Sequence, residues 1–257
     1  MVTSRNNPKI KDIVKLRKSS KSRASTGLYI VEGARLVFEA PRKQIKEIYV
    51  SDSFEQKHIN QIKSLGKSYQ VVSSDVFSYM SDTKTPQGIL GVISKRDYNL
   101  EEILGKEEPL ILMLEAIQDP GNLGTIFRTA EAAGVTGIIL NGECADIYNP
   151  KTIRSTMGSI YRIPFVVVEQ LRDVVGEVKN ASIKIYGTHL EGDFYDEMNY
   201  KNATTFIIGN EGSGLKEDTI KLADELVQVP MKGQVESLNV SVATAILVFE
   251  AAKQRRL

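Results

Sequence analysis

Residues 110–142, LILMLEAIQDPGNLGTIFRTAEAAGVTGIILNG, decide the fold class of this chain. The segment opens with the apolar run LILMLEA, which is typical of a strand that a parallel sheet buries on both faces. A helix is predicted from about Leu123 to Ala133, and TGIILNG then forms the next strand. A strand, a helix and a second strand in close succession indicate two parallel strands joined by a crossover helix.

The same alternation continues to the C-terminus. Asn149 and Pro150 are suited to the cap and first turn of a helix that runs to Ser159. A long closing helix is predicted within SLNVSVATAILVFEAAKQRR, and the further strands are FVVVE, SIKIYGTH, TTFIIGN and LVQVP. Several strands, each followed by a helix, predict an α/β fold with a parallel, doubly wound sheet.

The first part of the chain forms a smaller α/β unit. A helix is predicted over residues 7–19, with Pro8 in its first turn. Strands and helices then alternate through LYIVEGARLVFEAP, IKEIYV, QKHINQIKSLG, YQVVS, SSDVFSYMSD and GILGVIS. The acidic stretch DYNLEEILGKEEP follows and ends in proline, which is typical of a linker or bridging helix. The predicted domains are residues 1–97, a linker at 98–109, and residues 110–257.

Composition narrows the class of protein. Hydrophobic residues make up 42% of the 257 residues, which is enough for a buried core. No stretch approaches the roughly 20 apolar residues of a membrane helix, and the first residues lack the apolar core of a secretory signal. Cys144 is the only cysteine, so an internal disulfide is impossible and the reducing cytoplasm is the expected location.

The net charge of +1 hides an asymmetry between the two halves. Residues 1–97 carry 18 Lys and Arg against 9 Asp and Glu, a balance of +9, whereas residues 98–257 carry 15 against 23, a balance of −8. A basic half beside an acidic half suggests that the first half contacts a polyanion. A basic helix that simply faces water is an equally good interpretation of the charge alone.

Three blocks of unusual residues each follow a predicted strand. Block one is Gln118–Arg128 (QDPGNLGTIFR), block two is Ile208–Leu215 (IGNEGSGL), and block three is Pro230–Ala243 (PMKGQVESLNVSVA). Ligands of open α/β sheets bind at the carboxyl ends of the strands, so we expect the blocks to meet there. Arg128 falls on a helix rich in small and apolar residues, and we expect it to be buried with an anionic or polar partner.

Each block also has a simpler interpretation. In block one, Arg128 could be a solvent-facing helix residue, although its apolar and small neighbours argue against this. Block two could be no more than a glycine-rich turn, and Ser237 or Asn239 could be only the cap of the last helix. A nicotinamide or flavin enzyme is disfavoured because no strand is followed by G-x-G-x-x-G, and no Walker A sequence occurs. His58 and His189 lie in different halves, so no metal site is expected.

Together, in this order, the blocks resemble the signature motifs of the SpoU/TrmH RNA 2'-O-ribose methyltransferases of the SPOUT superfamily, over residues 110–256. The first half resembles the L30e-like substrate-binding domain often fused ahead of them, through IVEGARLVFEA and TPQGILGVI. The resemblance implies a C-terminal parallel sheet with an α/β trefoil knot, a smaller N-terminal L30e-like domain, and a homodimer with its active site at or near the subunit interface.

The resemblance also implies S-adenosyl-L-methionine as cofactor and assigns residues to it and to catalysis. The adenosine would contact mainly backbone at Thr188, Gly209, Asn210, Gly212, Val229, Met231 and Leu238. The catalytic group would be Arg128, Asn122, Glu211, Ser237 and Asn239. Because a guanidinium is a poor base, Arg128 is expected to orient the ribose 2'-hydroxyl, and a phosphate or Glu211 to receive its proton.

The implied substrate is structured RNA, with 23S rRNA favoured over tRNA by the two-domain layout. The residues predicted to contact RNA are Lys9, Lys11, Lys15, Arg17, Lys18, Lys21, Arg23, Arg35, Lys151 and Arg154. A tRNA methyltransferase, a methyltransferase that protects an antibiotic site, and a non-catalytic RNA-binding or ribosome assembly factor remain as alternatives.

Overall fold

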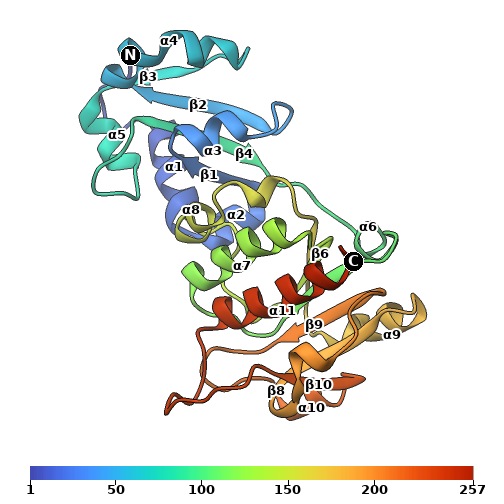
Figure 1. Ribbon diagram of the computed structural model, residues 1–257. Coiled ribbons are helices and arrows are strands. Elements are labelled where there is room, and N and C mark those ends of the chain that lie inside the picture. Colours follow the sequence, from blue (N-terminus) through green and yellow to red (C-terminus); the bar gives the residue numbers. More distant parts are fainter. Residues whose placement is uncertain (257) are drawn as a thin grey trace. The chain divides into compact units, whose positions relative to one another are not determined.

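A computed structural model describes residues 1–256 (Figure 1). The chain divides into two compact units. Unit 1 combines residues 1–96 with Asp146–Tyr161, and unit 2 combines residues 97–145 with those from 162 onward. Among residues 1–256, no helix is long and apolar enough to cross a membrane.

Unit 1 is built on a four-stranded mixed sheet with the order β1-β4-β2-β3. Strand β4 pairs antiparallel with β1 and β2, and β2 pairs parallel with β3. Its elements are α1 (Pro8–Lys18), α2 (Ser20–Thr26), β1 (Leu28–Glu32), α3 (Ala34–Glu39), β2 (Ile45–Ser51), α4 (Asp52–Ser64), β3 (Gln70–Val72), α5 (Ser74–Met80), β4 (Ile89–Ser94), α8 (Pro150–Thr156) and η1 (Ser159–Tyr161).

Helix α2 is absent from the sequence-based prediction. Ser19 leaves the helical conformation, with φ −121° and ψ 113°, and its hydroxyl oxygen accepts a hydrogen bond from the Ser22 N–H at 3.1 Å. A serine with extended backbone and this bond ends one helix and caps the next. The predicted helix over 7–19 is therefore followed at once by a second helix.

The segment 146–161 lies within the second half of the sequence but packs in unit 1. Arg23 donates two hydrogen bonds to the Asp146 carboxylate, at 2.9 and 2.6 Å. The Tyr148 ring lies 4.7 Å from that of Tyr29, and the Tyr161 hydroxyl donates to the Leu36 carbonyl. These contacts account for its place in unit 1.

Unit 2 contains a six-stranded sheet in which every pairing is parallel, as predicted, with the order β10-β8-β9-β5-β6-β7. Its elements are α6 (Leu100–Leu104), β5 (Leu110–Leu114), α7 (Pro120–Ala133), β6 (Gly137–Asn141), β7 (Phe165–Val168), α9 (Arg172–Asn180), β8 (Lys184–Phe194), η2 (Tyr195–Glu197), β9 (Thr204–Ile208), α10 (Glu217–Ile220), β10 (Glu225–Gln228) and α11 (Val240–Gln254).

Helices cover both faces of this sheet. Ile111 and Met113 of β5 join a core cluster with residues of α6 and α9 on one face. Helices α7 and α11 pack side by side against the other (Figure 1). All five residues of β5, β6 and β9 are buried, as expected for strands covered on two sides.

The order of the strands places the blocks. Strand β5 pairs with β6 on one side and with β9, far later in the sequence, on the other. Strands β6 and β7 are added on one side of β5, whereas β8, β9 and β10 lie on its other side. The strand order therefore reverses between β5 and β9, and ligands of open α/β sheets bind in the crevice at such a reversal. Blocks one and two follow these two neighbouring strands.

Candidate active site

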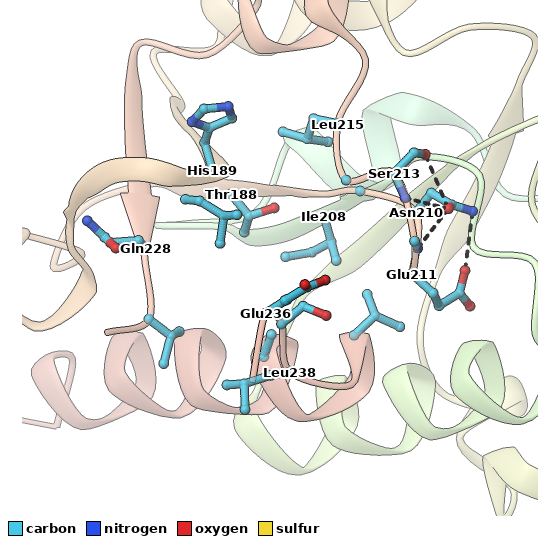
Figure 2. A pocket seen from close by; sticks show the side chains of 18 of the residues that line it. Thr188, His189, Ile208, Asn210, Glu211, Ser213, Leu215, Gln228, Glu236 and Leu238 are labelled. Atoms are coloured by element: carbon cyan, nitrogen blue, oxygen red, sulfur yellow. Dashed lines mark hydrogen bonds between the residues drawn. The ribbon is translucent and has the colours of Figure 1, made fainter. Parts of the chain in front are cut away.

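A pocket of about 390 Å³ lies at the carboxyl ends of β9 and β10 and beside the middle of β8 in unit 2 (Figure 2). This volume falls within the range of small-molecule sites. Its lining comes from four stretches of chain and the first half of α11: Thr188–Leu190, Ile208–Leu215, Val227–Met231 apart from Pro230, Glu236–Leu238, Val240, Ala243 and Leu247. All seven residues predicted to bind the cofactor are in this lining.

Glu211 connects blocks one and two. One carboxylate oxygen accepts the Gln118 N–H at 3.2 Å, and the other accepts the Asp119 N–H at 3.1 Å and the Asn122 side-chain amide at 3.2 Å. Burial alone would raise the pKa of Glu211, but the hydrogen bonds outweigh it and hold the pKa below its usual value. The carboxylate is therefore ionised at neutral pH and occupied by donors.

Asn122 connects the first two blocks to the third. While its amide nitrogen donates to Glu211, its side-chain oxygen accepts the amide of Asn239 at 3.0 Å. Asn239 also caps α11, because its oxygen accepts the Ser241 N–H at 2.9 Å. The structure thus confirms that the three blocks converge, and it shows that the capping role of Asn239 coexists with this contact.

Asn210 and Gly209 shape block two. The Asn210 oxygen accepts the N–H groups of Gly212 and Ser213, and its nitrogen donates to the Ala116 carbonyl at 2.8 Å. A side chain at Gly209 would place its Cβ 2.3 Å from the Gly214 carbonyl carbon. Asn210 is thus engaged within the protein on both ends of its amide, and only glycine fits at 209.

The remaining predicted cofactor residues line the pocket from its two sides. Figure 2 shows Thr188 and Ile208 on one side and Leu238, beside α11, on the other. The Thr188 hydroxyl donates to the Ile207 carbonyl at 3.1 Å, which leaves its backbone and methyl group toward the pocket. Ser237 is exposed in the lining and makes no hydrogen bond to any residue within 1–256.

Arg128 differs from its predicted environment. It lies on the exposed face of α7, and its guanidinium forms no ion pair or hydrogen bond with the described part of the chain. The buried face of α7 consists of Leu123, Gly124, Ile126, Phe127, Ala130 and Ala133, and helical periodicity turns position 128 away from it. The expectation of a buried, partnered Arg128 was wrong, and the guanidinium is available to an external group.

Sequence reasoning did not single out four polar lining residues: His189, Ser213, Gln228 and Glu236. The pairing of β8 with β10 explains the first, because Leu226 pairs with Gly187 and Val227 with Asp193. The intervening residues leave the ladder and carry His189 into the lining. No signal in the sequence marks this irregularity. Glu236 lies within block three and could have been singled out there.

The charged residues of the pocket lining indicate the charge of its ligand. Glu211 and Glu236 belong to the lining, and among the described residues no Lys or Arg lines the pocket. Such a lining favours a ligand with positive charge and disfavours one that carries a pyrophosphate. Among residues 1–256, no three His, Cys, Asp or Glu side chains are arranged to hold a metal ion.

The predicted RNA contacts separate into two groups. Arg23 is 3% exposed and donates to Asp146 and to the Leu16 and Arg17 carbonyls, so it is committed to the protein and unavailable to RNA. Its position one turn into α2, above the end of α1, explains the burial. Three further predicted residues have protein partners: Arg17 on the Tyr79 carbonyl, Arg35 on Glu39, and Arg154 on Asp82.

The five lysines of α1 and α2 remain exposed. The side chains of Lys9, Lys11, Lys15, Lys18 and Lys21 have no ion pair or hydrogen bond within the part of the chain that is described. Lys11, Lys15 and Lys18 are spaced four and three residues apart, which places them on one face of α1. Lys151 is exposed in the first turn of α8.

Comparison with known proteins agrees with this geometry. Residues 109–249, more than half of the chain, match the SpoU rRNA Methylase family. The chain belongs to the SpoU rRNA methylase family. Residues 7–91 match the MRM3-like substrate binding domain, which agrees with a separate substrate-binding role for the first half.

Individual members of the family match almost the entire chain. The 23S rRNA (guanosine(2553)-2'-O)-methyltransferase RlmP of Bacillus subtilis is 40% identical over 96% of this chain and 97% of that protein. A crystal structure of an AdoMet-bound rRNA methyltransferase from Sinorhizobium meliloti has a TM-score of 0.88 at 33% identity, over 98% of this chain and 97% of that one. The SpoU methyltransferase AviRb from Streptomyces viridochromogenes, in complex with AdoMet, has a TM-score of 0.87 at 26% identity, over 97% of this chain and 99% of that one.

Proposed function

We propose that this protein is an S-adenosylmethionine-dependent methyltransferase that modifies a ribose 2'-hydroxyl of 23S rRNA. The observation that carries the proposal is the junction of the three blocks, in which Asn122 joins Glu211 and Asn239 at the edge of the pocket. Similarity over nearly the whole length to a 23S rRNA enzyme that modifies a guanosine supports the substrate and makes guanosine the first nucleotide to test. Action on ribosomal RNA in the cytoplasm is part of this proposal.

The pocket suits S-adenosylmethionine in its size and its charge. Apolar groups of Ile208, Leu238 and Leu247 would contact the adenine, and the backbone at Thr188, Gly209, Val229 and Met231 would provide its polar contacts. Glu236 offers a carboxylate for the positively charged methionine part. When bound, this cofactor supplies a methyl group already activated by a sulfonium.

The protein has to position the ribose oxygen and manage its proton. Arg128, exposed and unpaired within residues 1–256, would orient the 2'-hydroxyl and stabilise its developing negative charge. It lies six residues beyond Asn122, about 9 Å along the helix at 1.5 Å per residue. Glu211 would hold the loops together, because its lowered pKa and its four hydrogen-bond donors make it a poor proton acceptor. A phosphate of the RNA is then the favoured acceptor.

A homodimer forms part of the proposal. Val242 and Phe249 of α11 are 48% and 43% exposed, and Ala245 and Ile246 between them are partly exposed. These residues form an apolar stripe along α11. The stripe supports a subunit interface along α11, which packs against α7, the helix that carries Arg128. The trefoil knot implied by the resemblance also belongs to this proposal.

The deciding experiment measures methyl transfer from labelled S-adenosylmethionine to 23S rRNA transcript and to bulk tRNA, followed by mapping of 2'-O-methyl groups. Wild-type protein is expected to label the 23S transcript, and Arg128→Ala to lose turnover while S-adenosylhomocysteine still binds. Binding of that ligand without methylation of any RNA or ribosomal particle would favour a non-catalytic assembly factor. Full activity of Arg128→Ala would remove Arg128 from catalysis.

A further inference from the structure

Ala116 occupies an unusual backbone conformation at the end of β5. Its φ is 54°, in the left-handed region, and its side chain is 6% exposed. For a residue other than glycine this conformation is unfavourable, because Cβ approaches the following carbonyl oxygen. It persists only where the surrounding structure enforces it.

Two asparagines from neighbouring strands enforce it. Asn141, at the end of β6 and 5% exposed, accepts the Ala116 N–H through its side-chain oxygen at 2.9 Å. Asn210, just after β9, donates its side-chain amide to the Ala116 carbonyl at 2.8 Å. Both polar groups of the Ala116 backbone are therefore held by side chains rather than by strand pairing.

The turn at Ala116 directs the next residues toward Glu211. The Ile117 carbonyl accepts the Ala145 N–H at 2.8 Å, and the N–H groups of Gln118 and Asp119 then point at the Glu211 carboxylate. Backbone polar groups of Ala116, Ile117, Gln118 and Asp119 thus find partners at the ends of β6 and β9 or in the segments that follow them. The conformation at Ala116 fixes where Glu211 and, through it, Asn122 lie.

We propose that Asn141 is a positioning residue for methyl transfer, acting through the left-handed conformation of Ala116. This inference rests on the proposed function and goes beyond it, because Asn141 neither lines the pocket nor belongs to the three blocks. Without the Asn141 side chain, the Ala116 N–H loses its acceptor and the backbone relaxes to a right-handed or extended conformation. The N–H groups of Gln118 and Asp119, which donate to the Glu211 carboxylate, then point away from it.

The size of the effect follows from the conformational preference. The left-handed penalty for a non-glycine residue corresponds to a factor of roughly 5 to 30 in the population of the competent loop. We therefore expect Asn141→Ala to lower kcat by that factor. Because residues 115–119 do not line the pocket, the affinity for S-adenosylhomocysteine should stay within about threefold of wild type.

Glycine provides the decisive rescue. At φ 54° glycine needs no enforcement, so Ala116→Gly should restore turnover to Asn141→Ala. Ser182→Gly is the matched control, because Ser182 is also a non-glycine residue of unit 2 with φ 58° but lies in the exposed turn before β8. Ser182→Gly relieves a left-handed backbone conformation of the same kind at a position outside the loop that contacts Glu211. Ile139→Val, two residues before Asn141 on β6, controls for a loss of stability alone.

The experiment measures kcat and KM for RNA, calorimetric affinity for S-adenosylhomocysteine, and Tm for each variant. Lost turnover in Asn141→Ala, restored by Ala116→Gly and not by Ser182→Gly, supports the inference. Unchanged turnover in Asn141→Ala overturns it, as does rescue by both glycines or by neither. If Asn141→Ala does not fold, the double variant is compared with Ala116→Gly alone: equal turnover supports the inference, whereas failure of glycine to restore folding or turnover overturns it. An inactive wild type that binds the ligand refutes the proposed function instead.

Discussion

Replacing Glu211 by glutamine tests the contact on which the convergence of the blocks depends. The two carboxylate oxygens accept one backbone N–H each, from Gln118 and Asp119, and glutamine offers a single oxygen. One N–H would face an amide nitrogen, and the other would lose its charged acceptor. Because both groups are donors, the mismatch cannot be relieved by a rotation of the amide.

The cost can be worked from these two bonds. A hydrogen bond to a charged group contributes about 1.5–3 kcal/mol and a neutral one about 0.5–1.5 kcal/mol, so the change amounts to about 2–4 kcal/mol. Glu211 is only partly buried, and water would satisfy part of the exposed donors, which reduces the expected loss to about 1.5–3 kcal/mol. At 1.4 kcal/mol per factor of ten, kcat/KM should fall by roughly 10- to 100-fold.

The assay is methyl incorporation into 23S transcript under kcat/KM conditions, with Tm measured in parallel. Glu143→Gln is the matched control, because Glu143 forms an exposed ion pair with Lys216 and its neutralisation should change little. Turnover of Glu211→Gln within twofold of wild type would refute the role assigned to this carboxylate.

The lowered pKa of Glu211 adds a pH test. Ionised Glu211 stabilises the native state above its unfolded pKa of about 4.3, and this contribution is lost as the pH falls through the lower native pKa. The difference in Tm between wild type and Glu211→Gln should therefore be constant near neutral pH and shrink below about pH 4. A difference that grows on acidification would contradict the assignment.

Three further predictions concern other parts of the chain. Replacing Lys11, Lys15 and Lys18 together by glutamine should weaken RNA binding and lower the slope of log Kd against log salt by about 2–3. Filter binding over a salt series measures this slope, and an unchanged slope would exclude α1 as an RNA contact. Phe249→Asp should shift the protein from dimer to monomer in sedimentation velocity, because it places a charge in the apolar stripe of α11, and a wild type that sediments as a monomer would argue against the interface. Burial raises the pKa of the Cys144 thiol to about 11. The rate at which iodoacetamide alkylates the native protein should therefore be low at pH 8 and increase toward pH 11. Rapid alkylation at pH 8 would show that the thiol is accessible and ionised.

The sequence by itself determined most of the strands and helices and the location of the blocks. Apolar runs such as LILML and TTFII identify strands that are buried on both faces, and Asn149 followed by Pro150 marks a helix start at the position observed. These features depend on neighbours within a few residues, whose spacing sets local conformation. The parallel sheet followed from the alternation of strands and helices, and the resemblance followed from three blocks that each come after a strand.

The tertiary structure decided which of these residues meet. The Glu211 carboxylate binds backbone 92 residues earlier, and Asn141 holds a peptide group 25 residues away, because the strand order places β5 between β6 and β9. The burial of Arg23 and the exposure of Arg128 likewise depend on packing. Local spacing carries no information on such distant pairs, since the free energy that brings them together comes from burying the whole sheet.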